Sequence, residues 1–189
     1  MRVALIYSGN ERSWDECRGN HMANLVGDCQ SFWHTVEALN LPPHFYELER
    51  GAHPYDQNKR PETTVASSFN QWHNNYIGFS LVPKGFDVYC RVRPDIEFTA
   101  PVRFEDYNYE GLKVYIPEGH DYWGGVNDQF AFGNWESMRV YYSVYLNHGL
   151  IFKDGVEFHT ERYTTENLKR NGVEIIRIPL TNHINRSEK

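Results

Sequence analysis

Residues 86–98 have the sequence FDVYCRVRPDIEF, the pattern of a buried strand that ends among charged side chains. In an extended chain the apolar side chains of Val88, Cys90 and Val92 point to one face. The opposite parity carries the side chains of Tyr89, Arg91, Arg93, Asp95 and Glu97. Pro94 cannot donate a ladder hydrogen bond, so it marks the end or the edge of the strand. If the chain stays extended through Pro94, the carboxylates of Asp95 and Glu97 lie on the same side.

The rest of the chain alternates between apolar runs and helical patterns, which indicates an α/β domain with a mostly parallel central sheet flanked by helices. Strands are expected at residues 3–7, 31–36, 44–48, 113–116, 129–132 and 173–178. Helices are expected after a capping box that begins at Ser13, over residues 64–81, from Asn134 to about His148, and from Thr160 to Arg170 with Gly172 at the C-cap. Residues 50–61 are expected to form a surface loop. A length of 189 residues fits a single domain, 1–189.

Charge and composition indicate a globular protein that does not bind nucleic acid. The formal net charge is -6, and the lysines and arginines are scattered, whereas a duplex-binding protein shows a clustered basic face. No apolar stretch approaches the length of a membrane span. The three cysteines have no C-x-x-C spacing, which is typical of free thiols in a reducing compartment. We therefore expect the protein in the cytoplasm.

Asp95 and Glu97 follow a strand of this sheet at its carboxyl end, where α/β sheets bind their ligands. Two carboxylates suit Mn²⁺ or Mg²⁺ better than zinc, because these hard cations prefer oxygen ligands. The alternative is an exposed acidic edge in which the carboxylates pair with Arg91 and Arg93. A short acidic motif does not by itself decide between the two interpretations.

The turn after the first strand is a candidate site for an anionic group. Ser8 and Gly9 lie between this strand and the first helix, where backbone N–H groups and the helix N-terminus can meet a phosphate. Arg12 would add a forked donor. The turn matches neither the G-x-G-x-x-G fingerprint nor the P-loop, and an ordinary turn with a surface arginine remains the alternative.

Four segments together resemble a known family. They are ALIYSGNERS (4–13), FDVYCRVRPDIEF (86–98), GGVNDQFAFGNWESM (124–138) and HTERYTTENLKRNGVEIIRI (159–178). In their order and spacing they are similar to small GT-A-fold glycosyltransferases of large DNA viruses, phages and bacteria. The resemblance covers most of the chain. It implies a nucleotide-diphospho-sugar transferase domain of the hexosyltransferase type, acting in viral or bacterial glycan synthesis in the cytoplasm of a bacterial cell or a virus-infected host.

The resemblance also assigns residues to a metal and nucleotide site. In this family an acidic motif holds a divalent cation that bridges the diphosphate of the donor, and the first acid often touches the ribose. It places Asp95 and Glu97 in those roles, beside Arg91 and Arg93. The second acid is Glu instead of the usual Asp, a longer arm. A histidine after the last core strand often completes the metal shell, which makes His183 the candidate and His159 the alternative.

Two further carboxylates are candidates for acid–base catalysis. Asp128 and Glu161 are each able to act as general base on an acceptor hydroxyl if the enzyme inverts. The alternatives are structural, because Asp128 suits a turn and Glu161 suits the first turn of a helix. Tyr122 and Trp123 can form a wall on which a sugar stacks, or they are ordinary packing.

The leading hypothesis is thus a metal-dependent glycosyltransferase that uses a UDP- or GDP-linked sugar donor and a glycan or glycoprotein acceptor. One alternative is a sugar-phosphate nucleotidyltransferase, although the sequence SGNERS (8–13) is a poor match to its Gly-rich loop. The other is a non-catalytic domain of the same fold that binds a glycan or a nucleotide. Turnover of a nucleotide-sugar separates an enzyme from a binding domain.

Overall fold

A six-stranded mixed sheet forms the centre of the molecule. The computed structural model describes residues 1–9, 13–34, 65–179 and 182–185. Across the sheet the strand order is β3-β1-β4-β8-β7-β9. The strands are β1 (Arg2–Ser8), β3 (Asp28–His34), β4 (Val88–Val92), β7 (Lys113–Pro117), β8 (Phe130–Gly133) and β9 (Glu174–Ile178). Only β8 runs against its neighbours β4 and β7, while the other neighbouring pairs in this described sheet are parallel. The predicted α/β class with a mostly parallel sheet is therefore confirmed.

The central strands are apolar on both faces, because helices cover both sides of the sheet. Val3, Leu5 and Tyr7 of β1 pack in one core cluster with Val88, Cys90 and Val92 of β4. Ala4, Ile6 and Tyr89 belong to a second cluster on the opposite face. The parity predicted for β4 is thus confirmed as far as Val92, and the continuous apolar run of β1 has the burial expected of a central parallel strand.

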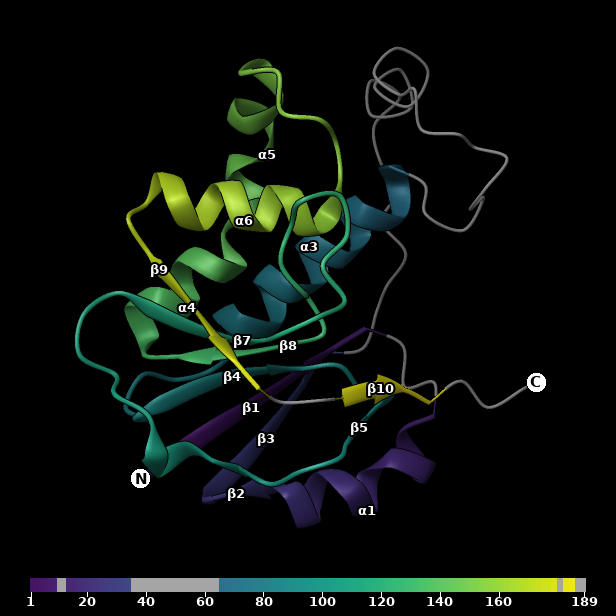
Figure 1. The fold of residues 1–189 in the computed structure, drawn as a ribbon, viewed down its shortest axis with the longest axis vertical. Helices are drawn as coiled ribbons and strands as arrows, with labels where there is room; N and C mark the ends of the chain where they lie inside the picture. Colours follow the sequence, from purple (N-terminus) through teal and green to yellow (C-terminus); the bar gives the residue numbers. More distant parts are fainter. Residues whose placement is uncertain (10–12, 35–64, 180–181, 186–189) are drawn as a thin grey trace.

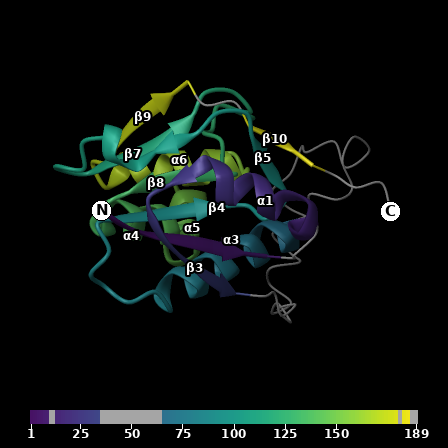
Figure 2. The ribbon, with the colours of Figure 1, turned by 90° about the horizontal axis from the view of Figure 1, so that it is seen from below.

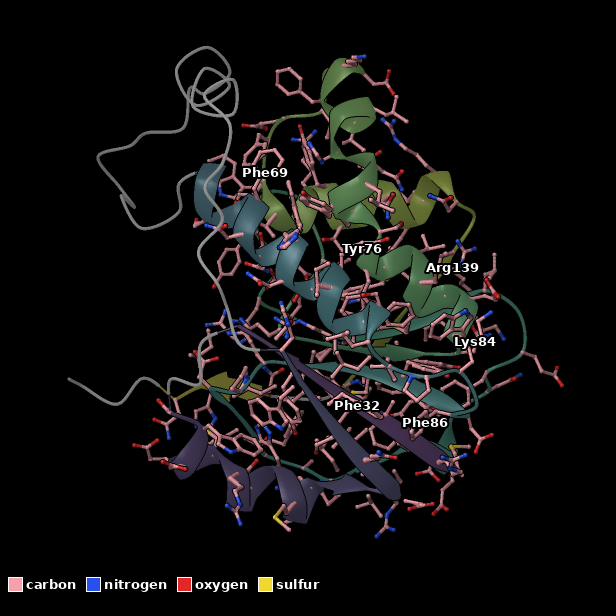
Figure 3. All side chains as sticks on the ribbon, turned by 180° about the vertical axis from the view of Figure 1, so that it is seen from behind. Phe32, Phe69, Tyr76, Lys84, Phe86 and Arg139 are labelled. Carbon is pink, nitrogen blue, oxygen red and sulfur yellow. The ribbon has the colours of Figure 1, made fainter. Side chains whose placement is uncertain are left out.

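The five described helices divide unequally between the two faces (Figure 1). Helix α1 (Trp14–Asn24) lies on one side, and the other side carries α3 (Val65–Ser80), α4 (Trp135–Tyr142), α5 (Val144–Lys153) and α6 (Thr160–Arg170). Helix α3 confirms the helix expected over residues 64–81. Phe69 and Tyr76 lie along it in Figure 3. None of the described helices is long and apolar enough to cross a membrane.

Two helix predictions need correction. Ser13 is the N-cap of α1, but its side chain makes no capping bond; its hydroxyl donates to the carbonyl of Asn185 at 2.8 Å. The helix expected from Asn134 to His148 is divided at Ser143 into α4 and α5. Asn134 does cap α4, accepting a hydrogen bond from the Ser137 N–H at 2.9 Å. Gly172, at φ 68, follows the end of α6 as expected.

The chain does not stay extended through Pro94, so the condition under which Asp95 and Glu97 would lie on the same side is not met. Strand β4 ends at Val92, a turn occupies residues 94–95, and β5 (Ile96–Phe98) pairs with β10 (Asn182–Ile184) in a separate antiparallel ladder. Figure 2 shows this ladder on the side where β1 and β4 end. A further small ladder joins β2 (Leu25–Val26) to β6 (Val102–Arg103), ahead of a short 3-10 helix at Phe104–Asp106. The β5–β10 pairing brings the end of the described chain to the carboxyl edge of the sheet.

Several predictions fall outside the described residues. They are the strand at 44–48, the loop at 50–61, Arg12, and the last two positions of the strand expected at 31–36. That strand is β3, which begins three residues earlier than expected.

Candidate active site

The candidate residues meet at the carboxyl edge of the sheet. Strand β1 ends at Ser8 and β4 at Val92, and the Arg93 N–H continues the ladder by donating to the Gln129 carbonyl at 3.0 Å. Because β8 is antiparallel, its beginning lies at this edge and brings Asp128 there as well. Ligands of α/β sheets bind at such edges.

Arg93 and Asp95 form a two-bond ion pair across the turn at Pro94. Arg93 Nε donates to Asp95 Oδ1 at 2.7 Å, and Nη2 donates to Oδ2 at 2.9 Å. The side chain of Asp95 is 1% exposed and that of Arg93 21%. Burial lowers the pKa of Arg93, but the hydrogen bond to Asp95 and the charges of Asp95, Asp128 and Glu161 raise it, and they prevail. The guanidinium therefore stays charged among three carboxylates.

Glu97 and His183 are brought together by the β5–β10 ladder, where they are register partners. His183 Nε2 lies 3.0 Å from Glu97 Oε2, and Asn185 Nδ2 donates to the other carboxylate oxygen at 2.8 Å. The Asn185 N–H also bonds to the Asp95 carbonyl at 2.7 Å, which ties the tail to the turn after β4. His183, the predicted histidine ligand, is thus adjacent to one of the two predicted acidic ligands.

These residues fit a divalent cation in part. Glu97 and His183 offer an oxygen and a nitrogen donor at one point, and Mg²⁺ is usually held by one or two carboxylates together with substrate phosphates. Asp95 does not share this point, because its carboxylate faces Arg93. Within the described residues no group of three His, Cys, Asp or Glu side chains could hold a metal ion. The acidic edge is therefore divided. Asp95 pairs with Arg93, in line with the alternative interpretation, but it is buried and not exposed, and Glu97 pairs with His183.

Asp128 is held by a helix that the sequence did not connect with it. Gln71 Nε2 of α3 donates to Asp128 Oδ2, and the Tyr141 hydroxyl donates to the Asp128 carbonyl at 3.4 Å. The same face of α3 reaches Ser8, whose hydroxyl donates to Asn75 Oδ1. Helix α3 therefore connects two candidate segments that are far apart in sequence.

Glu161 pairs with His159 at the beginning of α6. His159 Nδ1 lies 2.5 Å from Glu161 Oε2, and the two side chains are 9% and 13% exposed. Burial raises the pKa of Glu161, the bond to His159 lowers it, and the charge of Asp128 raises it, with a net upward shift. His159, the alternative metal ligand, is thus the partner of a carboxylate. Such a pair suits proton transfer, because the pKa of the acid is moved toward neutral pH.

The loop before Asp128 is fitted against the start of α6. A Cβ at Gly125 would lie 2.2 Å from the Glu161 carbonyl carbon and 2.3 Å from the Arg162 nitrogen, so only glycine allows this approach. The Val126 N–H donates to Thr165 Oγ1 at 2.9 Å. These contacts therefore fix the position of the segment that carries Asp128 relative to the helix that carries Glu161.

The predicted phosphate contacts are more internal than expected. Arg91 is 3% exposed, and its Nη1 donates to the carbonyls of Val92 at 3.1 Å and Ser8 at 3.5 Å. Its Nε is buried without a hydrogen-bond partner among the described residues, so a ligand or water oxygen would satisfy it. Gly9 has φ 116, and its N–H donates to the carbonyl of His34 at 3.3 Å. The nucleotide-binding roles of Ser8, Gly9, Arg91 and Arg93 stay predictions.

Comparisons with known proteins add one structural similarity. No protein-family model matches the chain. No curated protein matches it in sequence either. Among solved structures, the apo form of mouse xyloside xylosyltransferase 1 is similar, with 13% sequence identity and a TM-score of 0.46 over 93% of this chain and 72% of that chain. At this level the similarity assigns no role to any residue.

Proposed function

We propose that the protein is a metal-dependent glycosyltransferase of the hexosyltransferase type, which moves a sugar from a UDP- or GDP-linked donor to an acceptor hydroxyl. The observation that carries the proposal is the contact of Glu97 with His183, 3.0 Å apart at the carboxyl edge of the sheet. It accords with the resemblance of the sequence motifs to GT-A-fold glycosyltransferases. Three more carboxylates and Arg93 surround the same edge.

The proposed division of roles follows from the partners of each side chain. Glu97 and His183 would hold Mn²⁺ or Mg²⁺. When bound, the cation would supply positive charge that stabilises a diphosphate leaving group. Asp95 orients the guanidinium of Arg93, which is a forked donor suited to a phosphate or a sugar hydroxyl. Asp128, held by Gln71, accepts the proton of the acceptor hydroxyl.

Calorimetric titration tests the metal site. UDP, GDP and their sugars are titrated with and without Mn²⁺ into the wild type, Glu97→Gln and His183→Ala. Glu136→Gln is the matched control, because Glu136 is exposed in the first turn of α4 and its ion-pair partner among the described residues is Arg139, in the last turn of the same helix. We expect the two site variants to lose roughly tenfold or more of the Mn²⁺-dependent affinity, and the control to lose none.

A fourth variant decides the place of Asp95. If Asp95 leaves Arg93 and joins the cation when the donor binds, Asp95→Asn also loses the Mn²⁺-dependent affinity. If Asp95 only orients Arg93, that affinity persists. The proposal fails if no nucleotide binds to the wild type in either condition. Binding without metal-dependent hydrolysis of any nucleotide-sugar would indicate a binding domain instead of an enzyme.

A further inference from the structure

The loop that precedes Asp128 holds an aromatic residue in an uncommon position. Trp123 has φ 55, in the left-handed region that bulky side chains rarely adopt. Burial of the indole in the core does not compensate for this conformation, because Trp123 is 54% exposed and its neighbour Tyr122 is 41% exposed. Residues held in sparsely populated backbone conformations cluster at active sites and ligand-binding segments.

The surroundings keep Trp123 in this place. Gly125 lies against the backbone of Glu161 and Arg162 at a distance that excludes any side chain. Further along the loop, the Asn127 N–H donates to Asp121 Oδ1 at 3.0 Å. The exposed indole is therefore carried by a loop that is anchored on α6.

A histidine lies beside the exposed ring, and that histidine contacts Glu161. The centroid of the Trp123 ring is 6.0 Å from that of His159, with the planes 37° apart. His159 in turn bonds to Glu161, and both are largely buried, so their positions are set by packing. A sugar ring has an apolar C–H face and a rim of hydroxyls, which calls for an aromatic surface with a few fixed polar groups at its side.

We propose that Trp123 is the platform of a pyranose-binding subsite, in which the C–H face of a sugar stacks on the indole while Glu161 accepts a hydrogen bond from a ring hydroxyl. His159 is a positioning residue that orients the carboxylate. The role of this sugar in a transfer reaction rests on the proposed function. The existence of the sugar-binding subsite does not depend on it. The ring is that of an acceptor or of the donor, and the two sources are separable by experiment.

Binding is measured by saturation-transfer difference NMR with methyl glycopyranosides of glucose, galactose, mannose and xylose, and by calorimetry with UDP, GDP and their sugars. The informative variant is Trp123→Gly, because glycine adopts a positive φ without strain. We expect it to melt at the same or a higher temperature than the wild type while sugar affinity falls roughly tenfold. A residue that only supports the fold would not combine these two effects.

Further variants keep the test decisive. Trp123→Asn gives the same test if the glycine variant folds poorly, because Asn tolerates the left-handed region. Trp123→Phe should keep much of the affinity. Phe152→Ala is the matched control, since Phe152 is an exposed aromatic on α5. Glu161→Gln should weaken sugar binding, with His159→Gln giving a smaller loss.

Each outcome bears on the subsite. Weaker binding of methyl pyranosides by the Trp123 variants identifies an acceptor, and weaker binding of a nucleotide-sugar with unchanged nucleotide affinity identifies the donor sugar. The inference is overturned if the Trp123 variants bind methyl pyranosides and nucleotide-sugars as tightly as the wild type does. It is also overturned if the wild type binds the nucleotide but no pyranoside, and binds nucleotide-sugars no better than the nucleotide. A wild type that binds pyranosides through Trp123 but binds no nucleotide refutes the proposed function and leaves the subsite standing.

Discussion

Gly125→Ala offers a sharp test of the contact between the loop and α6. The added methyl group would lie 2.2 Å from the Glu161 carbonyl carbon and 2.3 Å from the Arg162 nitrogen, whereas ordinary contact begins at 3.4 Å. Both atoms belong to the backbone of a helix, so no side chain can rotate out of the way. The loop must therefore move away from α6 by more than an ångström.

The cost has two sources. Overpacking of this kind costs about 1–3 kcal/mol. Displacement also breaks the bond from the Val126 N–H to Thr165 Oγ1, and a buried donor left unpaired costs about 1–3 kcal/mol. We expect a loss of roughly 3 kcal/mol of unfolding free energy, which lowers Tm by roughly 6–12 °C in a domain of this size.

Urea denaturation and thermal melting measure the effect, with Gly149→Ala as the matched control. Gly149 lies within α5, where a Cβ would meet nothing within 4 Å, so the same substitution should stabilise by about 0.5–1 kcal/mol. Because Trp123 belongs to the displaced loop, Gly125→Ala should also weaken pyranoside binding. A Gly125→Ala protein as stable as the wild type would show that the loop does not rest on α6 as described.

Three more predictions concern single side chains. The pKa of Glu161 is raised above 4.5, chiefly by burial, so its ionisation opposes folding. Glu161→Gln should therefore unfold at higher urea than the wild type at neutral pH, with a difference that shrinks as pH falls through the raised pKa and vanishes below 4.5. A difference that grows in acid would contradict this. Arg93→Met leaves the buried carboxylate of Asp95 without its guanidinium and should cost about 3–5 kcal/mol in the same assay, part of which Asp95→Asn restores in the double variant. Asn134→Ala removes the cap of α4 and should cost about 1–2 kcal/mol; an unchanged urea midpoint would show that the cap contributes nothing.

The core of the fold was predictable because its signal is local. The continuous apolar run of β1 indicates a strand that is buried on both faces, and the alternation in β4 indicates which of its side chains share a face. The chain beyond Val92 was not predictable in this way. Strand β5 is three residues long and pairs with β10, which is also three residues long and lies more than eighty positions later. Neither segment is long enough to show a periodic pattern.

The failed cap at Ser13 shows that a local motif permits a bond without ensuring it. The sequence SWDE (13–16) satisfies the capping-box pattern, yet the hydroxyl of Ser13 bonds to the Asn185 carbonyl instead. A local motif states which bonds a side chain can make, and the tertiary structure decides which of them form. The same Asn185 bonds to Glu97 and to the backbone of Asp95, so one unpredicted contact of the tail arranges both candidate acids.

The contacts that hold the candidate carboxylates in place were not predictable from local sequence either. The residue types of Asp128 and Glu161 marked them in the sequence, but nothing in the sequence connected their segments with the helix expected over residues 64–81. On α3 the polar residues Ser68, Gln71 and Asn75 recur at intervals of three and four, so they share one face of the helix. Ser68 bonds to Thr160 at the start of α6, Gln71 to Asp128, and Asn75 to Ser8. Since buried polar groups must find partners, a polar row beside an apolar stripe signals that a helix lies along a polar edge of the sheet. The sheet order shows which edge that is, and α3 contacts three segments there: the end of β1, Asp128 and the start of α6.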